Sequence, residues 1–183
     1  SKDVSTPNQT STAPAALLVP IDNEQQLFDW LQHSVQQWSN DALAAVCAKH
    51  LSQHQSPLIT PDVFPLAVRS GLTATVRVCL TDDRMCPDPD QPLLQGRTPL
   101  MWACANGHLE IAQVLVAHNA NLSATTSTDG NTIMHFAAMN GHTTIVKWLL
   151  ERPNKVPPSD LNHQGHNPLY LAAKAGHAAI VKT

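Results

Sequence analysis

The sequence predicts an all-α fold, a solenoid of stacked helix–turn–helix repeats. Three segments align without gaps through a predicted first helix, and each segment ends in a Gly-His pair, at residues 107/108, 141/142 and 176/177. After each pair comes an apolar stretch with helical spacing: LEIAQVLVAH, TTIVKWLLER and AAIVK. Spacings of 34 and then 35 residues between the pairs are typical of proteins whose repeats bury their apolar faces against their neighbours.

The first part of the chain differs from the repeats. Residues 1–19 are rich in Ser, Thr, Pro and Ala and lack periodicity, which predicts a disordered tail. Residues 20–56 show apolar side chains at helical spacing in two successive stretches, namely Leu27, Trp30, Leu31 and Val35, then Leu43, Val46, Cys47 and Leu51. We expect these stretches to form an antiparallel helical pair that caps the repeat stack.

The repeat domain is expected to span residues 57–183. A degenerate first copy, residues 60–80, matches when Gly71 is aligned with Gly107, and it has Leu72 where the other copies have His. Clear copies follow at 96–124, 130–152 and 165–183. The fourth copy stops inside its second predicted helix, so we expect the natural protein to continue past Thr183.

Each repeat position has a physical reason for its residue type. Thr98, Thr132 and Asn167 are predicted helix N-caps. Proline follows two of these caps at the first helical position, where its missing N–H costs nothing. Small residue pairs, such as Ala137-Ala138, allow neighbouring helices to approach closely. Glycine at 107, 141 and 176 is predicted to end the first helix with a positive φ.

These motifs resemble the ankyrin repeat, whose hallmark is Thr-Pro-Leu-His-x-Ala-Ala followed by a Gly-His turn. The copies read GRTPLMWACANGH, GNTIMHFAAMNGH and GHNPLYLAAKAGH, and the resemblance covers residues 62–183, about two thirds of the chain. It implies that His135 hydrogen-bonds the turn of its repeat, a position that Met101 and Tyr170 occupy in the neighbouring copies. It also implies that the recurring His108, His142 and His177 are structural rather than metal ligands.

The resemblance further implies a protein partner bound on a concave face, which the hairpin tips and the exposed ends of the first helices line. Carried over position by position, the partner-binding residues are Leu94, Gln95, Arg97, Trp102, Ala105, Asn106, Thr128, Asp129, Asn131, Met139, Asn140, His163, Gln164, His166 and Lys174. Trp102 and Phe136 are either apolar anchors for the partner or packing residues within the stack.

Composition and motifs exclude several other classes of function. The net charge is −3 without a cluster of Lys or Arg, whereas a nucleic-acid binder needs a basic footprint. No apolar run approaches the roughly 20 residues of a membrane span. The chain lacks phosphate-loop, nucleophile-elbow and zinc-protease motifs. We therefore expect no catalytic residues, no metal and no cofactor, and a monomer that binds neither nucleic acid nor membrane.

The four cysteines have irregular spacing, which predicts reduced thiols and a cytoplasmic location. Cys79 and Cys104 replace small or apolar core residues and are expected to be buried. Two connections, residues 81–95 and 151–164, are rich in proline, and the first is also acidic. Each is either a partner-specific loop or a solvated linker.

Three functions remain open at this point. The chain is an adaptor that recruits one protein, or residues 20–56 act as an F-box-like ubiquitin-ligase adaptor, which the segment DALAAVCAKHL loosely resembles. Alternatively, the chain is the targeting domain of an enzyme whose catalytic part follows Thr183. The Gln-, Asn- and His-rich composition also resembles that of effectors which bacteria inject into host cells, and for an effector the expected location is the host cytosol.

Overall fold

The computed structural model describes residue 45 and residues 63–81, 87–152 and 156–182. The predicted tail at 1–19 and, apart from residue 45, the predicted helical pair at 20–56 lie outside the described residues. Cys47 and Cys86 lie outside them as well.

The described residues form four antiparallel helix pairs, in agreement with the predicted all-α solenoid. The pairs are α3 (Val63–Ser70) with α4 (Thr73–Thr81), α5 (Pro99–Asn106) with α6 (Leu109–Ala117), α7 (Ile133–Met139) with α8 (Thr143–Leu150), and α9 (Pro168–Lys174) with α10 (Ala178–Val181). A short 3₁₀ helix, η2 (Leu94–Gly96), precedes α5. No strand occurs in the described part of the chain.

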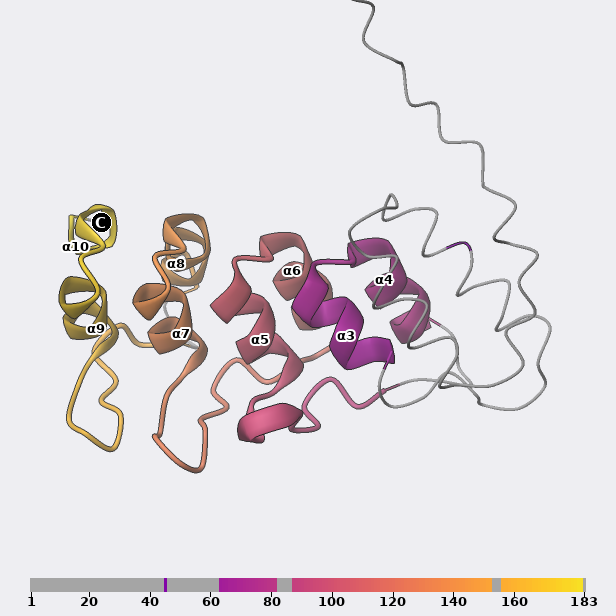
Figure 1. The fold of residues 1–183 in the computed structure, drawn as a ribbon, viewed down its shortest axis with the longest axis horizontal. Helices are drawn as coiled ribbons and strands as arrows, with labels where there is room; N and C mark the ends of the chain where they lie inside the picture. Colours follow the sequence, from indigo (N-terminus) through magenta and orange to yellow (C-terminus); the bar gives the residue numbers. More distant parts are fainter. Residues whose placement is uncertain (1–44, 46–62, 82–86, 153–155, 183) are drawn as a thin grey trace, which may run out of the picture.

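The pairs follow one another along the long axis of the molecule, and the connections between repeats project to one side (Figure 1). The first helices pack in one row, in which α3 contacts α5, α5 contacts α7 and α7 contacts α9. The second helices form the other row, where α4 contacts α6 and α8 contacts α10. We call the first row the inner helices and the second row the outer helices.

The predicted caps are present. Thr98 Oγ1 accepts a hydrogen bond from the Met101 N–H at 3.3 Å, and Asn167 Oδ1 accepts one from the Tyr170 N–H at 2.7 Å. At the same position in the third repeat the Thr132 N–H donates to His135 Nδ1 at 3.2 Å. These bonds satisfy backbone donors that a helix N-terminus otherwise leaves unpaired.

The Gly-His turns join each repeat to the one before it. The imidazole Nε2–H groups donate to main-chain carbonyls one repeat earlier: His108 to Arg69 at 3.1 Å, His142 to Ala105 at 2.9 Å and His177 to Met139 at 2.9 Å. Each ring lies against the glycine of the preceding turn, which has φ between 79° and 82° at residues 71, 107 and 141. These three histidines therefore have the predicted structural role, which is to join neighbouring repeats.

The core runs the length of the stack. Its largest fully buried side chains are Leu100, Met101, Ile111, Leu115, Ile133, Met134, Phe136, Ile145 and Leu149. Cys79 and Cys104 are buried, as predicted, and burial raises the pKa of the Cys104 thiol to about 12. Cys104 therefore stays a neutral thiol that packs as a small apolar residue. Among the described helices, none is long and apolar enough to cross a membrane.

Candidate functional site

A pocket of about 480 Å³ opens on the side of the inner helices and the hairpin connections. We call it the inner pocket. Three successive repeats contribute to it: the hairpin before α5, the hairpin before α7 with α7 itself, and the hairpin before α9 with α9. Its lining residues are Arg97, Asp129, Asn131, Phe136, Met139, Asn162, Gln164, Leu171, Lys174 and Ala175.

The third and fourth hairpins are held in place by hydrogen bonds that join them to one another. The Asn162 side chain donates from Nδ2 to Asn131 Oδ1 at 3.0 Å, and both residues are buried. The His163 N–H donates to the Asp129 carbonyl at 2.9 Å, and the His163 ring contacts the Thr128 carbonyl through Nδ1 at 3.1 Å. One wall of the inner pocket is therefore built from two hairpins that are hydrogen-bonded to each other.

The fourth hairpin is also shaped internally. Asn162 Oδ1 accepts hydrogen bonds from the Gln164 N–H at 3.1 Å and the His166 N–H at 2.9 Å. His135, buried in α7, donates from Nε2 to the His166 carbonyl at 3.0 Å. His135 thus reaches from its own helix cap to the next hairpin, so the predicted role of this residue in holding the turn is confirmed and extended to the following repeat.

Burial lowers the pKa of the His135 imidazole, against weaker opposing effects of its bond to His166 and the charge of Asp160. The lowered pKa agrees with the two hydrogen bonds of the ring. Because Nδ1 accepts the Thr132 N–H while Nε2 donates to a carbonyl, the ring carries a single proton, on Nε2. A second proton on Nδ1 would remove the acceptor.

Arg97 is held by aromatic rings. Its guanidinium carbon lies 4.6 Å from the ring centre of Phe136 and 4.9 Å from that of Trp102. The Trp102 ring also faces the Arg69 guanidinium at 5.1 Å. Phe136 is only 2% exposed and therefore packs within the stack, whereas Trp102 and Arg97 are half-buried. The rings fix the Arg97 side chain without pairing its charge.

The structure brings six of the predicted partner-binding residues together in the inner pocket: Arg97, Asp129, Asn131, Met139, Gln164 and Lys174. The other nine predicted residues do not line it. Gln95 (φ 64°), Asn106, Thr128, Asn140 and His163 are exposed, and Leu94 lies in η2. His166 is half-buried and stacks on Tyr170 with ring centres 4.2 Å apart.

Two of the predicted residues are poorly accessible. Ala105 and Asn131 are each only 8% exposed, Ala105 in the packed part of α5 and Asn131 in the hairpin bond described above. Asn131 lines the inner pocket, but its side-chain oxygen accepts the Asn162 amide, so its main contact is within the protein.

The sequence reasoning missed three residues of the pocket. Leu171 has the same repeat position as Trp102 and Phe136, and Ala175 the same position as Asn106 and Asn140, so the repeat register could have identified both. Asn162 had no such signal, because its role depends on the bent shape of its hairpin.

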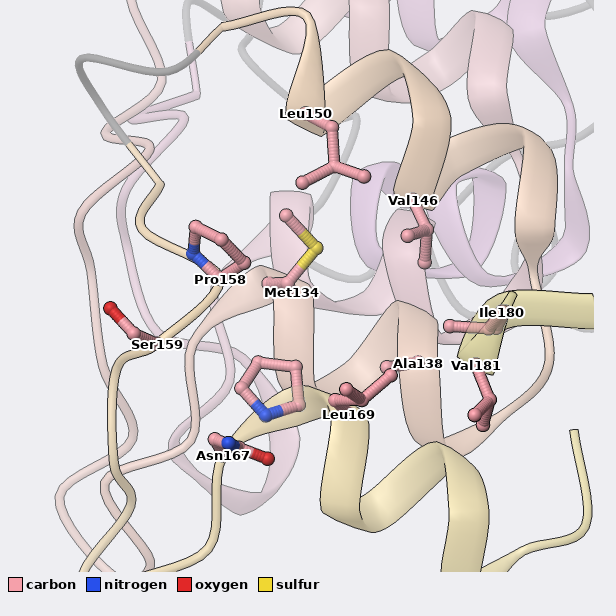
Figure 2. A pocket seen from close by; sticks show the side chains of 11 residues that line it. Met134, Ala138, Val146, Leu150, Pro158, Ser159, Asn167, Leu169, Ile180 and Val181 are labelled. Atoms are coloured by element: carbon pink, nitrogen blue, oxygen red, sulfur yellow. The ribbon is translucent and has the colours of Figure 1, made fainter. Parts of the chain in front are cut away.

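A second pocket, of about 350 Å³, lies at the seam between the third and fourth repeats (Figure 2). It is lined by apolar side chains from four helices: Met134 of α7, Val146 and Leu150 of α8, Leu169 of α9, and Ile180 and Val181 of α10. Its wall is apolar apart from Ser159 and Asn167, and Asn167 Oδ1 is already engaged as a helix cap. This cavity lacks the converging polar groups that orient a ligand, so the inner pocket is the better candidate site.

Within the described ranges, no group of three His, Cys, Asp or Glu residues could hold a metal ion. The inner pocket combines one carboxylate, two cationic side chains and carboxamides over an apolar floor of Met139 and Leu171. Charged, hydrogen-bonding and apolar groups therefore lie side by side in one pocket.

Comparison with known proteins supports this view of the fold. The chain matches the family model of ankyrin repeats in three copies over residues 26–126, 64–160 and 122–183. The first match begins inside the segment 20–56. Ankyrin repeats mediate protein–protein interactions.

Individual relatives share the repeats with this chain. A probable E3 ubiquitin-protein ligase of rice, XBOS32, is 31% identical over 116 residues, covering 48% of this chain and 23% of the relative. Ankyrin repeat domain-containing protein 63 of mouse is 36% identical over 90 residues, with the same shares. A homologue of transient receptor potential cation channel subfamily A member 1 from Caenorhabditis elegans is 32% identical over 120 residues, 63% of this chain and 9% of the relative.

The chain thus spans less than a quarter of the length of each of these relatives. None of the three is described as a bacterial effector. These relatives share the ankyrin repeats with this chain, and the match to the family model covers well over half of the chain's residues. The chain therefore belongs to the ankyrin-repeat family.

Proposed function

We propose that this chain is an interaction module that binds a protein partner through the inner pocket. The observation that carries the proposal is the convergence of three successive repeats on one polar pocket with an apolar floor. Because the hairpins are tied together by the Asn162–Asn131 and His163–Asp129 bonds, little conformational entropy is lost when a partner binds.

Exposed residues on the hairpins and inner helices extend the proposed contact surface. Gln95, Asn106, Asn140 and His163 are exposed on the hairpins and inner-helix ends, where the family resemblance places partner contacts. Arg97 and Trp102 supply the kind of rigid side chains that dominate binding energy at interfaces.

A steric block tests the proposal. Ala175 is exposed at the end of α9 and lines the pocket, so Ala175→Trp should fill the pocket without disturbing the core. Thr144→Trp on α8 is the matched control, because Thr144 is exposed on an outer helix. Immobilised wild-type chain and the T144W control should capture the same partner from a native lysate, and the A175W variant should lose it. Equal capture by both variants would show that the partner binds elsewhere.

A second candidate function follows from the rice relative, whose printed description is that of a ubiquitin ligase. In this candidate the repeats select a substrate for ubiquitination, and residues 20–56 bind the adaptor that F-box proteins use. Pull-down of that adaptor by the 183-residue chain tests the second part. The Leu31→Asp variant should lose the adaptor, and no recovery of the adaptor by the wild-type chain would reject the F-box idea.

A further inference from the structure

The inner pocket is lined by more positive than negative side chains. Arg97 and Lys174 line the pocket together with a single acidic residue, Asp129. Among the described residues, the one ion pair joins Arg77 of α4 to Glu110 of α6 at 3.3 Å, on the outer helices. Arg97 and Lys174 are therefore not part of it. The pocket is therefore a locally cationic site in a chain whose net charge is −3.

The Arg97 guanidinium is presented in a way that favours a carboxylate. Phe136 and Trp102 lie against it at 4.6 and 4.9 Å, and rings that stack on a guanidinium leave its N–H groups free along the edge. These groups match the two oxygens of a carboxylate. Because Arg97 is half-buried, its attraction to an anion is screened less than that of a fully solvated arginine.

The rest of the pocket indicates what accompanies the carboxylate. Met139 and Leu171 provide an apolar floor, while Gln164 on the rim carries an amide that can pair with a peptide backbone. Asp129 keeps the site from being uniformly positive. Arg97, Lys174 and Asp129 give the pocket lining one excess positive charge, which a singly charged carboxylate neutralises and a doubly charged phosphate would overcompensate. Three cations, with Arg69 included, are too few for a nucleic-acid footprint.

We propose that the partner presents an acidic peptide segment, with an Asp or Glu carboxylate bound at Arg97 and a neighbouring apolar side chain on the Met139–Leu171 floor, while Lys174 adds a second positive charge to the site. This inference rests on the proposed function, because it specifies the chemistry that the inner pocket selects. It commits to a polypeptide carboxylate rather than to a phosphate or a nucleic acid.

Selection from a random peptide library tests the chemistry directly. The 183-residue chain is panned against displayed 12-residue random peptides, and the recovered sequences are compared with the unselected library. We expect enrichment of Asp and Glu beside apolar residues. The double variant R97E/K174E should reverse the preference toward Lys and Arg, since both cations of the pocket become anions beside Asp129.

Point variants measure the contribution of each charge, with a recovered peptide labelled for fluorescence anisotropy. Arg97→Gln should weaken binding about tenfold or more, since truncating one member of a partly buried charge pair costs well over a factor of ten. Arg97→Lys should give an intermediate loss because it keeps the charge without the planar fork. Asp129→Asn should strengthen binding. Arg77→Gln, on the outer helices, is the matched control and should change the affinity less than about twofold.

The outcomes separate this inference from the function on which it rests. If the recovered peptides lack acidic residues but lose binding to the A175W variant, the pocket binds peptides and the acidic preference is wrong. If peptide binding is unchanged in A175W, both ideas fail. Recovery of no peptide, or R97Q-sensitive binding of a labelled single-stranded oligonucleotide tighter than that of the peptides, would also overturn the inference. Circular dichroism melts confirm that each variant is folded.

Discussion

At the Gly-His turns, a glycine of one repeat lies directly against the imidazole ring of the next repeat. A Cβ atom at Gly141 would lie 2.7 Å from the His177 ring, and one at Gly107 would lie 2.7 Å from the His142 ring. The same turn in the last repeat, at Gly176, has φ 81° but nothing within 4 Å. The chain therefore contains glycines that share a backbone conformation and differ in their surroundings.

This difference predicts unequal costs for one substitution. Gly176→Ala should cost only the strain of a positive φ, about 1 kcal/mol. Gly141→Ala should cost about 1–3 kcal/mol more, because the added methyl group must displace the His177 ring and its bond to Met139. Urea unfolding of the two variants measures the difference. Equal losses would mean that the Gly-His contact contributes no more than the backbone strain.

His135 makes stability depend on pH at the residue scale. Burial lowers its pKa in the folded chain below the ordinary value of 6.5, so the unfolded chain binds more protons as the pH falls below 6.5. Stability from this group is therefore present above that pH and is lost as the pH falls toward the pKa of the folded state.

Unfolding free energies at pH 7.5 and pH 5 test this dependence. We expect the wild-type chain to be less stable at the lower pH and His135→Gln to show a smaller decrease, because glutamine can retain both hydrogen bonds without titrating. An unchanged pH dependence in the glutamine variant would assign the effect to other groups.

At the scale of elements, the hairpins carry more structure than their sequences indicate. Asn162 makes three hydrogen bonds, one to Asn131 and two within its own hairpin. Asn162→Ala would leave the Asn131 oxygen and two backbone N–H groups without these partners.

We expect Asn162→Ala to destabilise the chain by about 1–3 kcal/mol and to speed amide hydrogen exchange in residues 157–167. Asn106→Ala is the control, because exposed Asn106 makes one bond, from Nδ2 to the Arg69 carbonyl at 3.1 Å. The control should cost less than about 0.5 kcal/mol. Similar losses in both variants would show that the Asn162 bonds are not special.

The helices themselves were predictable from sequence for a physical reason. The caps at Thr98 and Asn167 and the glycine that ends α5 act within one turn of the chain, so local sequence contains the information. The inner pocket depends on how hairpins 31 to 35 residues apart meet, as in the Asn162–Asn131 and His163–Thr128 contacts. Local pattern cannot supply that geometry, which is why Asn162 was missed and the burial of Asn131 was not foreseen.

Across the whole molecule, stability and binding follow from the same stacking. Each inner helix packs on the next, and the same register places one hairpin beside another. Leu169 and Tyr170 in the fourth repeat are 47% and 48% exposed, whereas their counterparts in the third repeat, Met134 and His135, are 1% and 0% exposed. The neighbouring repeat thus accounts for the burial of these positions, as expected of a solenoid.

The central claim is that a protein partner binds at the inner pocket. Site-specific photo-crosslinking tests it most directly, with a benzophenone amino acid at Gln164, on the pocket rim, or at Gln113, which is exposed on the outer helix α6. In both variants the probe replaces an exposed glutamine, so the variants differ only in which face of the stack carries the probe. A partner bound at the inner pocket should crosslink to position 164 and not to position 113. A crosslink confined to position 113 would contradict it.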